Sequence, residues 1–200
     1  MVVLEGKFVR LRPLALSDVD RLVEIGLDER IWHVNPDPVR TPEDMLRYVQ
    51  KALAGHADGT FVPFSIEFEG QVVGCSRYGN IVPEHRRLEI GWTWIAPAWQ
   101  GTVVNTEAKL LLFSHAFDTL AYNRVELKTD ARNTQSRAAM RAIGCVEEGT
   151  LRHHMILADG SLRDTVYFSV TRPEWPAVRD HLRARLERRA KPQSPSSSPA

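Results

Sequence analysis

The most informative segment of the chain is Glu89-Ile-Gly-Trp-Thr-Trp-Ile-Ala-Pro-Ala-Trp-Gln-Gly-Thr-Val-Val-Asn-Thr-Glu-Ala108. Its first part, up to Ile95, is rich in β-branched and aromatic residues and predicts a buried strand. A turn containing Gly101 follows, and then a helix for which Asn105 and Thr106 are candidate caps. A helix N-terminus presents unpaired N–H groups and the positive end of the helix dipole. The turn is therefore a candidate phosphate or pyrophosphate site.

A second informative segment runs from Lys128 to Cys145. It predicts the end of a strand, a helix that starts at Asn133, and Ser136 one turn further on. If the strands that precede the two segments are neighbours, Asn133 and Ser136 face the same groove as the Gly101 turn. Asn133 alternatively serves only as a helix cap. The segment is not a P-loop, because no Gly-Lys-Ser/Thr follows the glycine. It is not a dinucleotide-binding fingerprint either, because the required glycine spacing is absent.

Periodicity and turn signals along the rest of the chain predict one α/β domain, a mixed sheet covered by helices. Two hairpins are expected, around Glu69-Gly70 and Asp159-Gly160. The predicted strands cover residues 7–13, 61–68, 71–78, 86–95, 124–129, 145–154 and 162–170. The predicted helices cover residues 17–27, 42–53, 105–120, 133–143 and 174–189. Residues 192–200 form a Pro/Ser-rich tail that we expect to be disordered.

Composition excludes some functions. The 200 residues carry a net charge of +1, which gives no general field for nucleic acid or membrane. Six basic residues in 179–191 predict the solvated face of a terminal helix or, alternatively, a nucleic-acid arm. No apolar run could span a bilayer or act as a signal peptide, so we expect a cytoplasmic protein. Cys75 and Cys145 lack metal-ligand spacing and predict small core residues; we expect no metal.

These motifs together resemble the GNAT superfamily of N-acetyltransferases, and most closely its RimJ/RimL-like branch, the ribosomal-protein N-terminal acetyltransferases. The opening Leu-Glu-Gly-Lys-Phe-Val-Arg-Leu-Arg-Pro-Leu of residues 4–14 and the Arg163-Asp-Thr-Val-Tyr167 strand also match. The resemblance covers residues 4–178, leaving 179–191 as the end of the basic helix. It implies an α/β (α+β) fold with a mixed, mostly antiparallel sheet of about seven strands. That sheet would be splayed between the Glu89 and Arg124 strands, with helices on both faces.

The resemblance also implies acetyl-CoA as the acyl donor. The pantetheine arm would pair with backbone near Trp94 and Ile95 and with Asn133. The pyrophosphate would lie on the turn, while Arg137 or Arg141 would meet the adenosine phosphates. The implied cofactor residues are Trp94, Ile95, Gln100, Gly101, Thr102, Val103, Val104, Asn105, Thr106, Asn133, Ser136 and Arg137.

Two positions depart from the family pattern. Val103 stands where the family commonly has a second glycine, and it fits only if its φ is negative. Met140 replaces a tyrosine that serves many members as the general acid, and a thioether cannot donate a proton. An inactive CoA-binding regulatory or interaction module is therefore an alternative to an enzyme.

Glu89 and Ser136 are the candidate catalytic residues. Glu89 would take the proton of the amine, directly or through water, because burial among apolar neighbours favours proton uptake by a carboxylate. Alternatively, Glu89 forms an ion pair with Arg86 or Arg87. Ser136 would return a proton to the thiolate, or it only packs against pantetheine. With no Cys/His or Ser/His pairing, we expect direct transfer without a covalent enzyme intermediate.

The amine acceptor, a peptide N-terminus or a small molecule, would lie between the 31–38 loop and the 152–161 hairpin. Its candidate contacts are Trp32, His33, Asn35 and His154. Trp32 is alternatively a lid or core residue, and the histidines alternatively lie on the surface. A homodimer through the terminal helix or the 162–170 strand is a further possibility, whereas nucleic acid and membrane are not expected partners.

Overall fold

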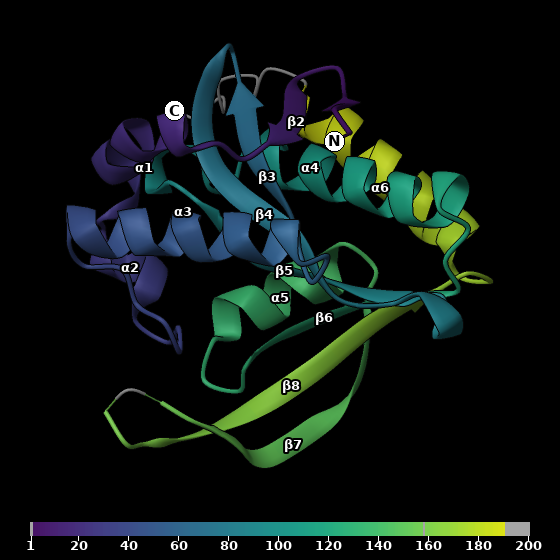
Figure 1. The fold of residues 1–200 in the computed structure, drawn as a ribbon. Helices are drawn as coiled ribbons and strands as arrows, with labels where there is room; N and C mark the ends of the chain where they lie inside the picture. Colours follow the sequence, from purple (N-terminus) through teal and green to yellow (C-terminus); the bar gives the residue numbers. More distant parts are fainter. Residues whose placement is uncertain (1, 158, 191–200) are drawn as a thin grey trace, which may run out of the picture.

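The computed structural model describes residues 2–157 and 159–190. Within them, eight strands form one sheet in the order β1-β2-β3-β4-β5-β6-β8-β7 (Figure 1). All neighbours are antiparallel except β5 and β6, which are parallel. The strands are β1 (Leu4–Glu5), β2 (Val9–Pro13), β3 (Val62–Phe68), β4 (Gln71–Val82), β5 (Arg87–Ile95), β6 (Arg124–Asp130), β7 (Val146–Ile156) and β8 (Leu162–Thr171). The predicted mixed, mostly antiparallel sheet is confirmed.

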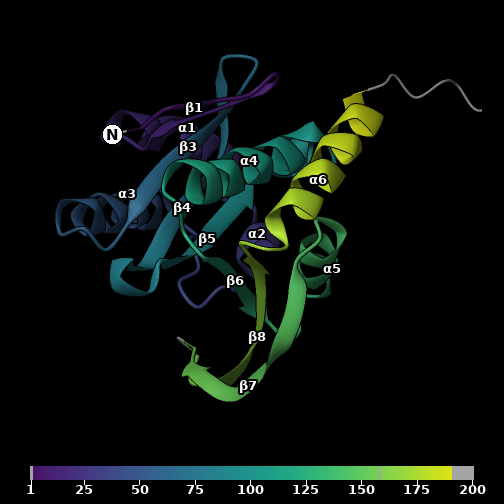
Figure 2. The same cartoon turned by 90° about the vertical axis from the view of Figure 1, so that its right-hand side faces the viewer.

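Helices cover both faces of the sheet, as predicted. Figure 2 shows α1 and α3 on one side and α5 and α6 on the other. The face with α4 and α6 buries the larger core cluster, and α1–α3 close a second cluster over β4 and β5. The helices are α1 (Val19–Gly26), α2 (Glu29–Trp32), α3 (Pro42–Ala57), α4 (Val103–Ser114), α5 (Thr134–Ala142) and α6 (Trp175–Ala190).

Several boundaries differ from the sequence-based predictions. β1 adds a strand to the expected seven, and the one-turn helix α2 lies where a loop was predicted. The predicted helix from Asn105 to Leu120 instead begins at Val103, and its last part, His115–Thr119, is π-helical. Its N-cap is Thr102, so the prediction of Asn105 or Thr106 as the cap is wrong. Thr102 is the cap because its hydroxyl accepts a hydrogen bond from the N–H of Val104, two residues further along the chain, as an N-cap residue does.

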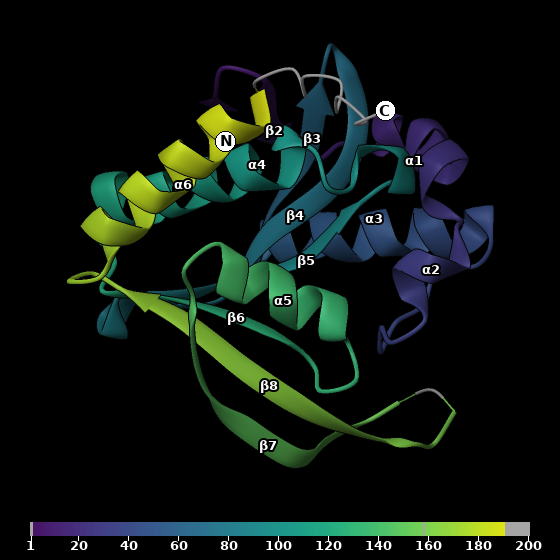
Figure 3. The same cartoon turned by 180° about the vertical axis from the view of Figure 1, so that it is seen from behind.

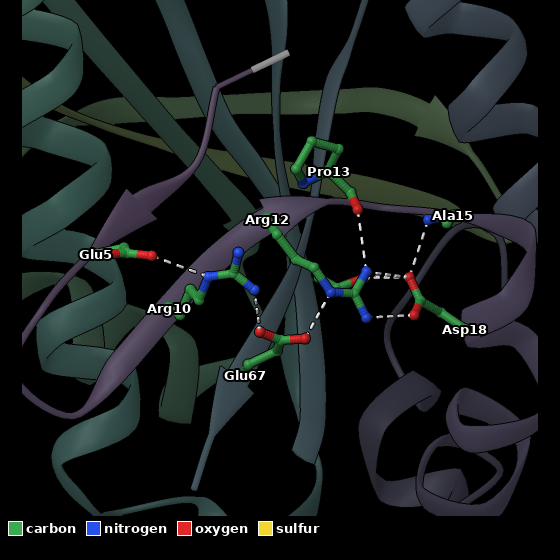
Figure 4. Close-up of polar contacts among 8 residues, drawn as sticks. Glu5, Arg10, Arg12, Pro13, Ala15, Asp18 and Glu67 are labelled. Atoms are coloured by element: carbon green, nitrogen blue, oxygen red, sulfur yellow. Dashed lines mark hydrogen bonds and ion pairs between the residues drawn. The ribbon is translucent and has the colours of Figure 1, made fainter. Parts of the chain in front are cut away.

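A polar network fixes the edge of the sheet to the start of α1 (Figure 4). Arg12 donates to both carboxylate oxygens of Asp18, at 2.9 and 2.6 Å, and to Glu67 at 2.5 Å. Asp18 also accepts from Ser65 at 2.7 Å. Burial acts to raise the pKa of Asp18, but these bonds outweigh it and the pKa is lowered. Asp18 therefore holds β2 and β3 instead of capping α1 through its side chain.

Trp175 attaches α6 to the larger core. Its ring lies 5.4 Å from that of Phe117, and its Nε1 donates to Asp118 at 2.8 Å. Cys75 and Cys145 are buried free cysteines, as predicted for small core residues, and burial raises the pKa of each thiol to about 12. Of the helices in the described ranges, none is both long and apolar enough to cross a membrane. The predicted tail, residues 192–200, lies outside the described residues.

Candidate functional site

The sheet opens between β5 and β6. The two strands pair only at their first residues, Arg87–Glu89 with Arg124–Glu126. Beyond Glu89, β5 continues along β4, and β6 continues along β8, without pairing to each other. Figure 3 shows α4 and α5 on the same face of the sheet, α4 beside β5 and α5 beside β6. The predicted splay between the Glu89 and Arg124 strands is confirmed.

A β-bulge lies on β5 inside the opening. Gly91 faces Arg77 and Trp94 faces Cys75, so Trp92 and Thr93 together oppose a single residue of β4. Trp92 has a φ of 50°, a left-handed conformation that costs a bulky residue about 1–2 kcal/mol. Bulges re-aim backbone groups and side chains and are frequent next to active sites. The strained backbone at Trp92 therefore lies close to the point where β5 and β6 separate.

The turn after β5 has the geometry of an anion site. Gly101 has a φ of 76°, and nothing lies within 4 Å of the position a Cβ would take there, so the turn is open on this side. Thr102 caps α4 and leaves other first-turn N–H groups free. Val103 is the first residue of α4 and is not among the residues with positive φ. A valine therefore fits at this position, where the family commonly has a second glycine. Thr106 is buried within α4.

Arg189 of α6 adds a positive charge to this turn. Its Nη1 donates to the carbonyl of Thr102 at 2.7 Å. Nearby Arg185 has its pKa lowered by burial first and then by Arg189 and Arg188. Sequence reasoning assigned these residues to a solvated helix face or, alternatively, a nucleic-acid arm, because nothing in the sequence shows that the end of α6 reaches a turn 87 residues earlier.

The start of α5 lies beside the same turn, as predicted. Gln135 Nε2 donates to Gln100 Oε1 at 3.2 Å across the opening. Asn133 caps α5 by accepting from the N–H of Ser136 at 2.9 Å, and its amide nitrogen is not used in this bond. Arg137 and Arg141 both pair with Glu147.

Met140 of α5 is only 6% exposed and belongs to the larger core cluster. Its burial among apolar residues agrees with its inability to act as a proton donor. The Ser136 side chain, by contrast, is half-buried near the start of the helix.

Glu89 lies at the point where the strands part, on the face away from α4. Its neighbours Leu88 and Ile90 enter the larger core, whereas its own side chain, 3% exposed, accepts from Lys128 at 2.9 Å and from Asn80. Both donors bind Oε2. Oε1 lies 2.7 Å from where a Cβ would stand at Gly91, so that glycine gives the carboxylate room. The ion-pair partner is Lys128, not Arg86 or Arg87 as the alternative had it.

Lys109 of α4 is a buried lysine on the opposite face. It is 5% exposed, and its Nζ donates to Thr93 Oγ1 at 2.8 Å, within the bulge. Thr93 Oγ1 also shares a hydrogen bond with Ser76. Burial lowers the pKa of Lys109 to about 8, an effect that Cys145 and Glu89 partly oppose. Sequence reasoning missed this residue, whose only signal was a lone lysine in an apolar helix.

The predicted acceptor residues lie in different surroundings. Trp32 is buried in the second core cluster and donates to the carbonyl of Gly26 at 2.6 Å, so it is a core residue. His33 is exposed and Asn35 accepts from the N–H of Asp37, a local turn contact. His154 is exposed, with its ring 5.9 Å from that of Tyr167.

Two hollows of the surface lie away from this opening. One of about 460 Å³ is lined by residues 150–153 of β7, and one of about 220 Å³ by residues of β1–β3 and their turns. Neither hollow is lined by a residue of β5. The candidate site is therefore defined by the opening between β5 and β6. In the part of the chain that the structure describes, no three His, Cys, Asp or Glu side chains group as a metal site requires.

The fold and the opening between β5 and β6 define a class of protein. Residues 9–146 match the family model described as the acetyltransferase (GNAT) domain. This match covers more than half of the chain, which therefore belongs to the GNAT acetyltransferases and is an acyltransferase.

Named relatives place the chain in the RimJ-like branch. It is 28% identical over 177 residues to "Putative ribosomal N-acetyltransferase YdaF" of Bacillus subtilis (strain 168), covering 85% of this chain and 94% of that one. A GCN5-related N-acetyltransferase of Brucella melitensis matches with a TM-score of 0.85 and 30% identity, over 92% and 85% of the two chains. RimJ of Mycobacterium smegmatis, solved with CoA-disulfide, matches with a TM-score of 0.75 and 28% identity, over 88% of each chain.

Proposed function

We propose that the protein transfers an acetyl group from acetyl-CoA directly to a primary amine, at a peptide N-terminus or on a small molecule. The observation that carries this proposal is the opening between β5 and β6. It has the first-turn N–H groups of α4 that the Thr102 cap leaves free at one end and the Glu89 carboxylate at the other. Family membership supports acetyl transfer, and the amine acceptor is carried over from the family resemblance.

The residues present fit acetyl-CoA. Between Gln100 and Asn105, the turn offers N–H groups other than those of Gln100 and Val104, which bond to Pro97 and Thr102. The open side at Gly101 and the charge of Arg189 also favour a pyrophosphate. The unpaired edge of β5 at Trp94 and Ile95 offers backbone groups to the amides of pantetheine. Acetyl-CoA supplies an acetyl group activated as a thioester.

The protein's own residues then handle protons and charge. Oε1 of Glu89 accepts no hydrogen bond from the described residues, so it is free to take the ammonium proton of the acceptor, directly or through water. Backbone N–H groups of the bulge at Trp92 and Thr93 polarise the thioester carbonyl. Ser136, near the start of α5, donates a proton to the leaving thiolate, directly or through water.

A charge placed in the turn tests the proposal. Gly101→Asp should abolish acetyl-CoA binding, because a carboxylate would face the pyrophosphate. Gly101→Asn is the matched control, since asparagine has nearly the same size and tolerates the positive φ of this position. Calorimetry that found equal affinities for the two variants would contradict the assignment of the turn.

Turnover is tested separately, by release of free thiol from acetyl-CoA in the presence of peptides, polyamines and small amines. Release with at least one amine supports the enzyme. Tight cofactor binding with no release across the whole set would instead favour the CoA-binding module.

A further inference from the structure

Arg163, near the start of β8, is a buried cation. The residue is 6% exposed, and none of the described residues forms a hydrogen bond with its Nε. Burial lowers its pKa, and the attraction of Asp130 and Glu89 only partly opposes this effect. A charged group that is buried without an ion pair or hydrogen bonds lowers the stability of the folded protein. An unpaired buried charge therefore indicates that a binding partner is missing from the structure.

The carboxylates around Arg163 are already engaged. Asp130, whose attraction on Arg163 is the largest, accepts from the guanidinium of Arg132 through both oxygens, at 2.9 and 2.8 Å. Glu89 accepts from Lys128. Among the described residues, none supplies Arg163 with an ion pair.

Arg163 lies on the same face of the sheet as Glu89. On β8, Thr165 faces Asp130 and Tyr167 faces Lys128, the residue bound to Glu89. Since side chains alternate along a strand, Arg163 shares the face of Thr165 and Tyr167. The opposite face is the one that α4 covers, where Val166 and Phe168 enter the larger core.

Arg77 of β4 provides a contrast. It too is buried, at 2% exposed, and its Nη2 has no partner. Its guanidinium, however, lies 4.7 Å from the ring centroid of Tyr48 and 5.1 Å from those of Phe61 and Trp92. Three cation–π contacts partly compensate its charge. Arg163 has no such contact among the described residues.

We infer that Arg163 binds a carboxylate of the acceptor, so that the substrate is an amine that also carries a carboxylate. This inference rests on the proposed function. The phosphates of CoA are assigned to the turn at the far end of the opening, and pantetheine is uncharged, so the anion must come from the acceptor. The planar fork of a guanidinium matches a carboxylate through two parallel hydrogen bonds.

Matched acceptor pairs test the inference. The probes are free α-amino acids with their carboxamides, and a tetrapeptide amide with aspartate at its second position beside the same peptide with asparagine. Calorimetry measures their binding to the protein saturated with CoA, so the readout needs no turnover. The wild-type protein should bind the charged member of at least one pair about tenfold or more tighter, as expected for a hydrogen bond between charged groups.

Variants connect this preference to Arg163. Arg163→Met should bind both members of the pair equally, with its affinity for CoA unchanged. Arg183→Met, at an exposed position of α6, should behave as wild type. If Arg163→Met does not fold, Arg163→Lys should reduce the preference several-fold, since it keeps the charge but loses the fork.

Two results would overturn the inference: no pair shows a preference in the wild type, or the preference is as large in the Arg163 variants as in the wild type. Amino acids and peptides are separate arms, so the arm that shows the preference identifies the source of the carboxylate. Thiol release is measured independently. If no thiol is released, the proposed function is contradicted. The binding preference is judged separately, from the calorimetry alone.

Discussion

Replacing Lys109 by methionine should stabilise the protein at neutral pH. The lysine carries its charge in a buried position, with one hydrogen bond to Thr93. A pKa of about 8 instead of 10.5 corresponds to about 3 kcal/mol of destabilisation at pH 7. The variant loses the hydrogen bond, which is worth about 1 kcal/mol. The net gain is about 2 kcal/mol, or about 4–8 °C in Tm for a chain of this size.

The gain should depend on pH in one direction. Between pH 8 and about 10.5, the unfolded chain keeps the proton on Lys109 while the folded chain has lost it. The unfolded state then binds more protons, so this lysine makes wild-type stability rise with pH across that window. The advantage of Lys109→Met should therefore shrink from pH 7 to pH 10.

The buried thiols Cys75 and Cys145, whose pKa values are raised, act in the opposite direction above pH 9. Both proteins contain them, so the comparison of variant with wild type largely removes their effect. The assay is urea unfolding at pH 7, 8.5 and 10, with Lys51→Met as the control at an exposed position of α3. The reasoning fails if Lys109→Met is no more stable than wild type at pH 7, or if its advantage stays constant with pH.

Three further substitutions test other parts of the site and fold. Glu89→Gln should lower thiol release at pH 7 by about 10²–10⁴-fold without changing acetyl-CoA affinity; an unchanged rate would remove Glu89 from the mechanism. Arg189→Gln should weaken acetyl-CoA binding several-fold at low salt and less at high salt, whereas Arg183→Gln should not. Equal affinities in calorimetry would show that Arg189 contributes nothing to the turn. Glu107→Gln should destabilise the fold by about 2 kcal/mol or more, because the Glu107 carboxylate accepts from three backbone N–H groups of residues 7–9. Unchanged urea unfolding would contradict that role.

Much of the fold could be predicted because its signals are local. Alternating apolar residues and the Glu69-Gly70 turn define the hairpin of β3 and β4 within one or a few residues. The opening between β5 and β6 came from the family resemblance, and the strand pairing confirms it. Elements of one turn or two residues, such as α2 and β1, were missed because they are too short for any periodicity.

The electrostatics of the site could not be predicted, because they depend on strand register. The partner of Glu89 is Lys128, 39 residues away, and sequence reasoning considered only the adjacent arginines. The cap of α4 was misplaced for a different reason. Thr102, Asn105 and Thr106 are all good cap residues, and only the chain direction after Gly101 selects Thr102.

The opening of the sheet gives the protein two strand edges in its interior. The last six residues of β5 and the last four of β6 each present one backbone edge without a neighbouring strand. A ligand that hydrogen-bonds along the β5 edge behaves as a short extra strand, so occupancy and folding become linked. At a hundred times its dissociation constant, such a ligand adds about 2.7 kcal/mol to the stability of the native state. The amides of residues 90–95 should then exchange their hydrogens more slowly as the ligand concentration rises, so hydrogen exchange in the middle of the sheet reports how much of the opening is occupied.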